Sequence, residues 1–509
     1  MSKQLIPLTI GTPGFFGLNT QDAGSVLPPG WATTADNCSF DDLGRLAARM
    51  GTRQVNGTIL TGTPAPTVLA IGEHWDLSGN ATNILAADNK IYKESGGIMT
   101  DVSGTITTPT GDDWQFALFN GNFVGYQSGH TPIENTSAAA PAFADATGTQ
   151  KNGSMVLSAY GRLWTVVSGT LWYSDLLIND YGSGSAGSLN LSQYWPNGYD
   201  EAIALADFNG FLVVFGKESI IIYENPDDVD NIAIAETVSG IGCPYRDTVQ
   251  VIGSDLVFLS ETGLRSLKET LQRQGKERMD DISRHVRDQL LLDLSGETPI
   301  KVKSAYHPDK GFYALSLPTK GRSYYFDTRF KNNDGSWRVC TWNIAPTAFH
   351  YSRDETLYLA VTDGYLSKYT GYRDEDSSGG TGGESYSMIF EGVWNDFGQE
   401  VGNLIKIPKN VSVVGAGVAG GVVNFRWRMD YSTAWNSVSL SFNANAPSTY
   451  NNANYAVDTY SASADFERVR SQLTRTGQVL MPGVTTTIDG NAFALQRIDL
   501  LAKVGKLGL

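Results

Sequence analysis

The side chains that most often carry out chemistry are sparse and scattered in this 509-residue chain. The five histidines stand far apart, and none forms the HxxxH or HExxH spacing that places two imidazoles on one helix face for a metal. They are His74, His130, His285, His307 and His350. A GxSxG nucleophile elbow and a Walker-type phosphate loop are also missing from the sequence. We therefore predict no catalytic residue, no metal site and no cofactor, and expect that the chain is not an enzyme.

Carboxylates carried by short polar motifs are the next candidates for chemistry. Asp41 and Asp42 are adjacent, as in some metal sites, but acidic pairs are also typical of turns, where they accept backbone hydrogen bonds. The run Asp334-Gly335-Ser336-Trp337 is similar to the Asp-box turn of sialidases, although Asp and Gly are adjacent here. A glycosidase needs two carboxylates that face the sugar, and the sequence does not show which of the 53 acidic residues converge. We interpret both motifs as turns.

Residues 268–294 form the most basic stretch of an acidic chain. The net charge is −15 and the pI is near 4.8, which argues against tight binding to a phosphate backbone. Ile282, Val286 and Leu290 recur every four residues, which predicts an amphipathic helix of several turns inserted between strands. The candidate interaction residues of this stretch are Arg273, Lys276, Arg278, Arg284 and Arg287. They would contact DNA or an acidic protein neighbour, or form a solvated basic face.

Cysteine usage and hydropathy bear on where the protein is made. Cys38, Cys243 and Cys340 are isolated and odd in number, which favours buried thiols in a protein made in a reducing cytosol. The early apolar run is broken by prolines and glycines, so no secretion signal is predicted. No apolar run is long enough for a bilayer, so no membrane-spanning segment is expected.

Repeated β-hairpins are the elements that must position these side chains. In residues 204–224, two apolar segments flank Gly216-Lys217-Glu218, as expected of two strands buried on both faces. Similar hairpins begin near Ile84, Phe123, Leu163, Leu212, Leu256, Tyr313 and Leu357. A spacing of roughly 45 residues is the size of one β-propeller blade. The sequence therefore predicts an all-β fold with a propeller of about seven blades, within a range of six to eight.

The propeller does not account for the whole chain, which we divide into four parts. Residues 1–60 are expected to contribute to a platform domain and to the first blade. Residues 61–372 form the propeller with its helical insertion at 268–294, and residues 373–385 form a linker or long loop. Residues 386–509 are expected to form the platform, a β-sandwich or barrel. Its strands are predicted at 387–390, 406–414, 422–429, 437–442 and 493–504.

Several motifs resemble the packaged-DNA stabilisation proteins of short-tailed bacteriophages, also called tail nozzle or tail hub proteins. They are residues 160–164, 172–175, 211–223, 324–327 and 335–337, together with the opening NCSFDDLGRLAARMGT at 37–52. The resemblance spans roughly residues 30–370, and residues 495–504 are compatible with it. It depends on pattern and order rather than on a catalytic signature. The basic stretch at 268–294 and the Asn-rich loop at 447–454 match it poorly.

The resemblance implies a structural protein of the virion tail, assembled in the host cytoplasm. Six copies would extend the portal–adaptor channel as a nozzle, retain packaged DNA and conduct it during ejection. The implied partners are the adaptor, further copies of the chain, and tail needle, spike or fibre proteins, whereas DNA would pass through the lumen without tight or specific binding. Two alternatives stay open: a carbohydrate-binding or glycan-cleaving propeller of a phage tail, and a generic scaffold propeller with a peptide partner.

Overall fold

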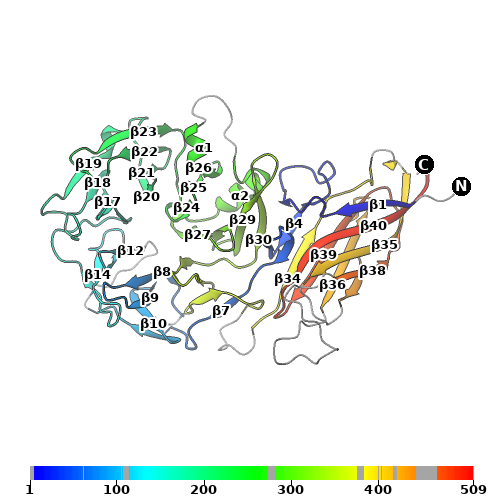
Figure 1. The fold of residues 1–509 in the computed structure, drawn as a ribbon, viewed down its shortest axis with the longest axis horizontal. Coiled ribbons are helices and arrows are strands. Elements are labelled where there is room, and N and C mark those ends of the chain that lie inside the picture. Colours follow the sequence, from blue (N-terminus) through cyan, green and yellow to red (C-terminus); the bar gives the residue numbers. More distant parts are fainter. Residues whose placement is uncertain are drawn as a thin grey trace.

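The structure is a computed structural model that describes residues 5–60, 62, 64–104, 106, 114–272, 281–374, 383–398, 401–402, 404–416, 421–442 and 467–507. The fold is all-β, as predicted: antiparallel sheets form a β-propeller, and a β-sandwich lies beside it (Figure 1). Both chain ends lie at the outer end of the sandwich, away from the propeller. Within the described residues, every helix is too short or too polar to cross a membrane.

Seven sheets follow one another around the propeller, and we call them blades 1 to 7. Blade 1 holds β8 (Val68–Trp75), β9 (Ala81–Ala87), β10 (Lys90–Ser95) and β11 (Ile98–Asp101); blade 2 holds β12 (Gln115–Phe119), β13 (Asn122–Tyr126), β14 (Ile133–Asn135) and β15 (Ala144–Asp145). Blade 3 holds β16 (Leu157–Ala159), β17 (Arg162–Val167), β18 (Thr170–Tyr173) and β19 (Gly187–Asn190); blade 4 holds β20 (Ala202–Phe208), β21 (Phe211–Gly216), β22 (Ser219–Glu224) and β23 (Ala233–Ser239). Blade 5 holds β24 (Gln250–Ile252), β25 (Asp255–Ser260) and β26 (Gly263–Ser266); blade 6 holds β27 (Lys303–His307), β28 (Phe312–Leu317), β29 (Arg322–Lys331) and β30 (Trp337–Trp342). Blade 7 holds β31 (Ala348–Tyr351), β32 (Leu357–Ala360), β33 (Ser367–Tyr369) and β7 (Thr52–Gln54).

The predicted repeat is confirmed strand by strand. Each of the seven hairpin positions named from the sequence lies in the second strand of a blade. In blade 4, β21 and β22 are buried on both faces because each face meets a different neighbour. Val213 and Phe215 pack in one core with Phe258 of blade 5, and Leu212 packs in another with Trp164 of blade 3. A strand of this kind lacks polar alternation because neither face meets water.

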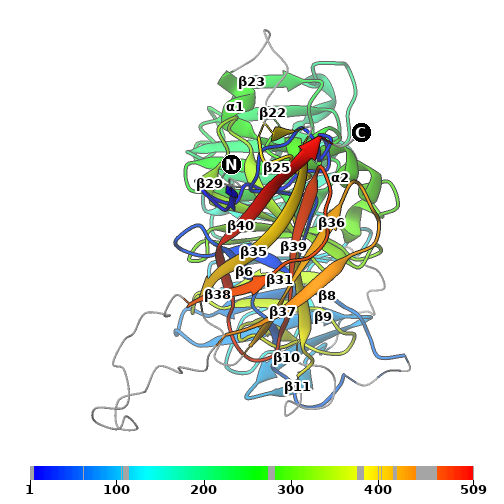
Figure 2. The same ribbon diagram turned by 90° about the vertical axis from the view of Figure 1, so that its right-hand side faces the viewer.

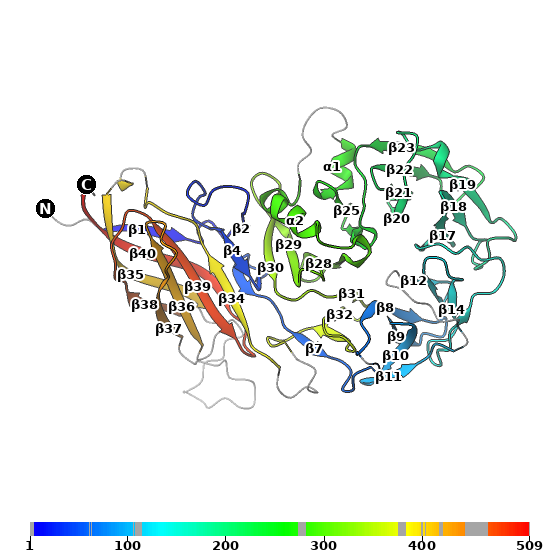
Figure 3. The ribbon, with the colours of Figure 1, turned by 180° about the vertical axis from the view of Figure 1, so that it is seen from behind.

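The ring is closed by the chain's own beginning. β7 pairs antiparallel with β33, from Thr52 opposite Tyr369 to Gln54 opposite Ser367 (Figure 3). The Asn56 side chain extends this contact by donating to the Gly364 carbonyl at 3.1 Å. We expected residues 1–60 to contribute to the first blade, but β7 instead completes the last one. Sequence order misleads here because a closed ring makes the first and last blades neighbours.

The sandwich combines strands from both ends of the chain (Figure 2). Its outer sheet holds β1 (Leu5–Ile10), β5 (Cys38–Phe40), β6 (Leu46–Ala48), β35 (Leu404–Ala416), β38 (Glu467–Gln472) and β40 (Ala494–Leu507). Its inner sheet holds β4 (Thr34–Asp36), β34 (Tyr386–Glu391), β36 (Val422–Met429), β37 (Asn436–Ser441) and β39 (Leu480–Ile488). The five strands predicted after residue 386 are confirmed, whereas β38 and β39 were not predicted. β39 contains Pro482-Gly483, a pair that is typical of turns.

The inner sheet of the sandwich continues into the propeller. β4 pairs with β34 on one side and, at Asp36, with Thr341 of β30 on the other. Blade 6 and the inner sheet are therefore one nine-stranded sheet. The short parallel pair β2 (Gly17–Leu18) and β3 (Trp31–Ala32) lies in the same N-terminal region.

The helical insertion is shorter and more broken than predicted. Its described parts are α1 (Leu267–Gln272), the 3₁₀ turn η3 (Arg284–Val286) and α2 (Arg287–Leu294). Ile282, Val286 and Leu290 are all buried, so the predicted apolar face is confirmed. The single helix through Ile282 is wrong, because Ile282 donates its backbone N–H to Leu264 of β26. Residues 273–280 lie outside the described part of the chain, as do the Asn-rich loop 447–454 and most of the predicted linker, 375–382.

Arg49 is the polar centre of the junction between propeller and sandwich. Its side chain is fully buried, and its guanidinium donates to Asn37 at 2.9 Å, to Asn343 at 3.0 Å and to both carboxylate oxygens of Asp374 at 2.8 and 2.6 Å. It also lies 4.0 Å from the ring centre of Tyr386 on β34. One side chain thus joins the N-terminal segment, the end of blade 6, the segment after blade 7 and the sandwich.

Replacing Arg49 is expected to destabilise this junction. In an Arg49→Ala variant, these three partners and the Met50 carbonyl lose their donor in a buried site, so we expect a loss of about 3 kcal/mol in the free energy of unfolding. Guanidinium titration followed by tryptophan fluorescence measures this loss. Lys90→Ala is the matched control, because it removes the ion pair with Asp101 at the surface of blade 1 and should cost about 1 kcal/mol or less. Equal losses in the two variants would contradict a central role for Arg49.

Candidate functional site

The basic residues predicted to form an interaction site are only partly described. Arg273, Lys276 and Arg278 lie outside the described residues. Arg284 and Arg287 lie at and just after η3, with side chains that are 59% and 41% exposed. The Arg284 guanidinium is 3.7 Å from the carboxylate of Asp334, and that of Arg287 is 3.5 Å from Asp288. Each positive charge therefore has a negative neighbour, and the binding role stays a prediction.

The motifs interpreted as turns are turns in the structure. Asp41 accepts backbone N–H groups from Leu43 and Arg45, and Asp334 accepts the N–H and the hydroxyl of Ser336. The three cysteines are buried and unpaired by disulfides, as predicted. Within the ranges that the structure describes, no cluster of three or more His, Cys, Asp or Glu residues is arranged to hold a metal.

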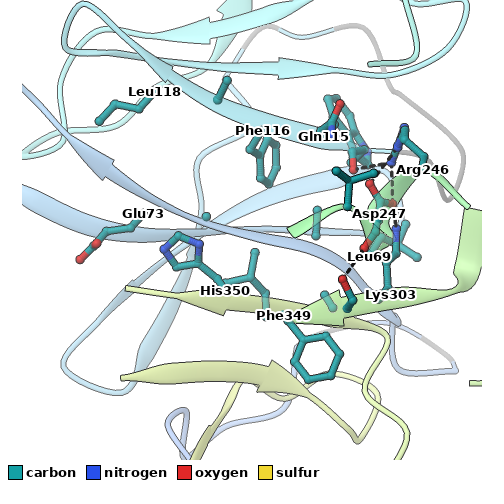
Figure 4. Close-up of a pocket in the computed structure, with 18 of the residues that line it drawn as sticks. Leu69, Glu73, Gln115, Phe116, Leu118, Arg246, Asp247, Lys303, Phe349 and His350 are labelled. Carbon is teal, nitrogen blue, oxygen red and sulfur yellow. Dashed lines mark hydrogen bonds and ion pairs between the residues drawn. The ribbon is translucent and has the colours of Figure 1, made fainter. Parts of the chain in front are cut away.

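A candidate site formed by several blades together is a cavity of about 410 Å³ on the propeller axis (Figure 4). Its walls come from the innermost strands β8, β12, β20, β27 and β31 and from the segment of η2 (Arg246–Thr248) and β24. The volume falls within the range typical of small-ligand pockets, about 300–1,000 Å³. A DNA duplex, whose major groove alone is about 12 Å wide, does not fit through it.

An ion-pair cluster closes one side of this cavity. Asp247 lies between two cations: Arg246 donates to its two oxygens at 2.9 Å each, and the Lys303 ammonium donates at 2.5 Å. Arg246 also donates to the carbonyl oxygens of Ser154 at 2.5 Å and Trp114 at 3.3 Å. The cluster therefore connects blades 2, 5 and 6 with the segment before blade 3 through charge-assisted hydrogen bonds.

Arg246 and Lys303 keep the Asp247 carboxyl ionised. Burial by itself would raise the pKa of this carboxyl. The charges and hydrogen bonds of Arg246 and Lys303 outweigh burial, and they lower the pKa of Asp247 to about 2. Asp247 is thus a fixed anion at neutral pH, which does not suit a general acid.

The rest of the wall is aromatic and less polar. Trp114, Phe116 and Phe349 line the cavity with His350, and Glu73 lies on the side away from the ion-pair cluster. Burial lowers the pKa of His350 despite the nearby carboxylates, so its imidazole is neutral at pH 7. Its Nε2 atom is buried and has no hydrogen-bond partner among the described residues. Such a wall suits stacking and hydrogen bonding to a small neutral molecule better than acid–base chemistry.

Sequence reasoning did not find this cavity. Asp247 and Lys303 are 56 positions apart and lie in no recognisable motif. They meet because the inner strands of several blades converge on the axis. The single local signal is the adjacent pair Arg246-Asp247 before an inner strand, and such pairs are common on surfaces.

The charge of the molecule is distributed unevenly over the blades. Residues 68–239, which make up blades 1 to 4, contain 20 acidic and 5 basic side chains, a net charge of −15. The rest of the chain contains 33 acidic and 33 basic side chains and is neutral overall. The acidity that was read from the whole sequence therefore belongs to one part of the propeller, which we call the acidic half.

Comparisons with known proteins add little. No family model and no curated protein matches this chain. Similar solved structures include the extracellular domain of the putative one component system BT4673 from B. thetaiotaomicron, with 12% identity and a TM-score of 0.42, over 91% of this chain and 64% of that one. A chain of the mitotic checkpoint complex has 10% sequence identity and a TM-score of 0.36, and the match covers 64% of this chain and 94% of that one. The Pan2 WD40 domain of Neurospora crassa has 11% sequence identity and a TM-score of 0.35, and the match covers 64% of this chain and 95% of that one. This chain spans less than two thirds of the first of these. At such scores the likenesses carry no argument about function.

The ion-pair cluster should give the fold a defined acid sensitivity. Because the pKa of Asp247 is lower in the folded chain than its ordinary value of 3.8, its ionised form stabilises the fold above about pH 4, and this contribution is lost as the pH falls toward 2. An Asp247→Asn variant should lose about 3 kcal/mol of unfolding free energy at pH 7. The gap from the wild type should narrow between pH 4 and pH 2, measured by urea titration at each pH.

The control for this experiment is Asp88→Asn. Asp88 is an exposed turn residue with φ of 53°, a conformation that Asn also accepts. This variant should stay within about 0.5 kcal/mol of the wild type at every pH. If the difference in unfolding free energy between Asp247→Asn and the wild type does not change with pH, the ionised Asp247 carboxylate does not stabilise the fold through Arg246 and Lys303.

Proposed function

We propose that this chain is a structural protein of a short-tailed phage virion. Six copies form a ring that extends the portal–adaptor channel as the tail nozzle, or hub. The ring retains packaged DNA and conducts it during ejection, and it contacts the adaptor and the needle, spike or fibre proteins. It is assembled in the host cytoplasm and has no catalytic role. The main support is the resemblance of residues 30–370 to this family.

The structural observation that agrees with the proposal is the continuous sheet that joins propeller and sandwich. A channel wall that holds pressurised DNA must resist bending between its domains. The nine-stranded sheet and the buried Arg49 cluster give this chain such a rigid connection. Flexible linkers between independent domains would not serve this purpose equally well.

The DNA path in this proposal lies between copies rather than through one copy. The propeller axis is occupied by the cluster of Arg246, Asp247 and Lys303 and by the aromatic residues of the cavity. Only a ring of several chains can therefore surround a duplex. Six copies would carry a formal charge of −90, six times the −15 of one chain. We propose that part of the acidic half faces the lumen and repels the DNA backbone, an effect that salt limits to about 10 Å at 0.1 M.

The direct test uses DNA-filled capsids that carry portal and adaptor but lack this protein. Purified protein is added, and the tail vertex is imaged without imposed symmetry. A ring of six at that vertex, with slower DNA loss from the particles, is the expected result. A chain that binds no vertex would contradict the proposal.

Charge reversal in the proposed lumen should slow DNA ejection. Glu201 and Glu218 are exposed neighbours in blade 4, where the Lys217 N–H donates to the Glu201 carbonyl at 3.0 Å. A Glu201→Lys/Glu218→Lys variant should bind the DNA backbone during transit, and we expect ejection several-fold slower, measured by dye release from single particles. Glu261→Lys, on the equivalent turn of blade 5, is the control and should eject like the wild type. An unchanged rate of DNA ejection in the double variant would contradict the proposal that acidic side chains line the lumen.

A second candidate function is glycan binding by the propeller. The aromatic cavity on the axis favours it, because sugars stack on aromatic rings. Cleavage is less favoured, since Asp247 is committed to two cations and Glu73 is the other carboxylate that lines the cavity. A glycan array with the wild type and a Phe116→Ala variant separates the candidates. Glycan binding by the wild type that is lost in the Phe116→Ala variant would support the hypothesis that the propeller binds glycans.

A further inference from the structure

Blades 1, 3 and 4 present large apolar side chains to solvent on one side of the propeller. Leu77 is 82% exposed, Leu176 is 52%, Leu177 and Ile178 are 53% each, and Phe211 is 36%. All lie at or beside turns between the first and second strands of a blade, or in the loop between the third and fourth strands of blade 3. These connections leave the propeller on the same side because successive strands of each blade are antiparallel. We call these five residues the apolar turn patch.

Residues of blades 2 and 3 bridge the members of the patch. The Asn120 side chain of blade 2 donates to the Leu177 carbonyl at 3.1 Å, and Leu177 donates its N–H to Gly161 at 2.8 Å. A Cβ atom on Gly121 would lie 2.5 Å from the Leu77 side chain, so blades 1 and 2 are in contact here. The exposed apolar side chains of blades 1 and 3 therefore lie near one another around Asn120 and Gly121, and grouped exposed apolar residues mark interaction sites.

The backbone conformation of Leu177 also indicates that the exposed patch is a contact surface. Leu177 has a φ of 58°, a left-handed conformation that is unfavourable for a bulky residue. A polar or glycine residue would be both more soluble and less strained at an exposed turn. Strain of this kind is typically kept where a surface is used.

Two acidic side chains lie near the Phe211 end of the patch. Tyr160 donates its hydroxyl to the Phe211 carbonyl at 2.8 Å. Partial burial raises the pKa of Tyr160 to about 12, and the carboxylates of Asp207 and Asp227 add to the effect. Both carboxylates are exposed, and no charged partner of either is seen among the described residues. A partner surface should therefore combine apolar and basic side chains.

The outer sheet of the sandwich, whose strands β35, β38 and β40 lie at the front in Figure 2, carries side chains of that kind. On β40, Ile498 and Leu500 point into the core, so the alternate residues face outward. The outward basic residues are Arg497 and Lys503 of β40 and Arg468 and Arg470 of β38. Asp499 lies among them, 3.0 Å from Arg468 and 3.1 Å from Arg497, and Leu501 is a half-buried apolar neighbour. We call this surface the basic sheet face, and its four cations outnumber its single anion.

We propose that the apolar turn patch of one copy packs against the basic sheet face of a second copy, so that copies join head to tail. The two surfaces belong to distant parts of the chain, the propeller and the far end of the sandwich (Figure 1), so they cannot meet within one molecule. Two patches facing each other would bring their acidic rims together, which disfavours a two-fold contact. A head-to-tail contact uses two different surfaces and generates a ring when the rotation from copy to copy closes. This inference depends on the proposed ring and names the contact that builds it.

The test exchanges charges between the two surfaces. The acid-reversed variant is Asp207→Lys/Asp227→Lys, and the base-reversed variant is Arg468→Glu/Arg470→Glu. Native mass spectrometry and sedimentation velocity measure assembly. We expect the wild type to form rings and each variant alone to associate at least tenfold more weakly. An equimolar mixture should form rings again, with equal numbers of the two variants, because each altered surface then meets an opposite charge.

Matched controls reverse charges elsewhere on the surface. Glu261, on an exposed turn of blade 5, and Lys331, the exposed last residue of β29, belong to neither surface. Glu261→Lys and Lys331→Glu should therefore assemble like the wild type. Thermal unfolding of every variant confirms that it is folded. A Leu176→Ser/Ile178→Ser variant, which spares the charges, should also weaken assembly.

The outcomes separate this inference from the proposed function. Rings that persist in both reversed variants, or a mixture that does not restore them, would overturn the contact while leaving a nozzle of other geometry intact. A wild type that is monomeric at every concentration would also overturn it. The binding of wild-type protein to the tail vertex of DNA-filled capsids tests the proposed nozzle function. That test does not depend on the outcome of the charge-reversal experiment.

Discussion

The fold depends on the requirement that every blade be covered on both faces. β21 and β22 are apolar on both sides, so a blade with one missing neighbour would expose a sheet of valine, isoleucine and phenylalanine to water. A ring removes the problem only when it closes. Closure here is a strand pairing, β7 with β33, contributed by residues that precede the first blade. The stability of the whole propeller is therefore linked to a segment of three residues that has little apolar surface of its own.

The same segment links the propeller to the sandwich. The chain leaves the outer sheet at Ala48, passes Arg49 and enters blade 7 at Thr52. Arg49 is charged and fully buried, which is tolerated because its guanidinium is satisfied by Asp374 and two asparagines. Such a residue favours one arrangement of the two domains, since any other would leave a buried charge without partners. A rigid connection of this kind suits a protein that acts as a wall, whichever ring geometry it adopts.

Two surfaces of different character are thus held in fixed positions. One is the acidic half of the propeller with its apolar turn patch, and the other is the basic sheet face of the sandwich. The axial cavity is a third feature, in which Asp247 is held as an anion by Arg246 and Lys303. The cluster connects inner strands of different blades, so it contributes to the packing of the propeller as well as to the wall of the cavity. A structural role for the cluster and a ligand-binding role for the aromatic wall are compatible.

The sequence by itself determined the repeating unit of this protein. Hairpins at Ile84, Leu212 and Leu357 were recognisable because strand burial, turn residues and spacing are local properties of the chain, and their number matches the blades. Local patterns also predicted the apolar face at Val286 and Leu290, although the backbone hydrogen bond of Ile282 to β26 shortened the helix. Only the tertiary structure decided which strand closes the ring, that Pro482-Gly483 lies inside a strand, and which side chains meet on the axis. The reason is physical: closure, domain junctions and the Asp247 cluster join residues far apart in the chain, and no local pattern encodes the partner of such a contact.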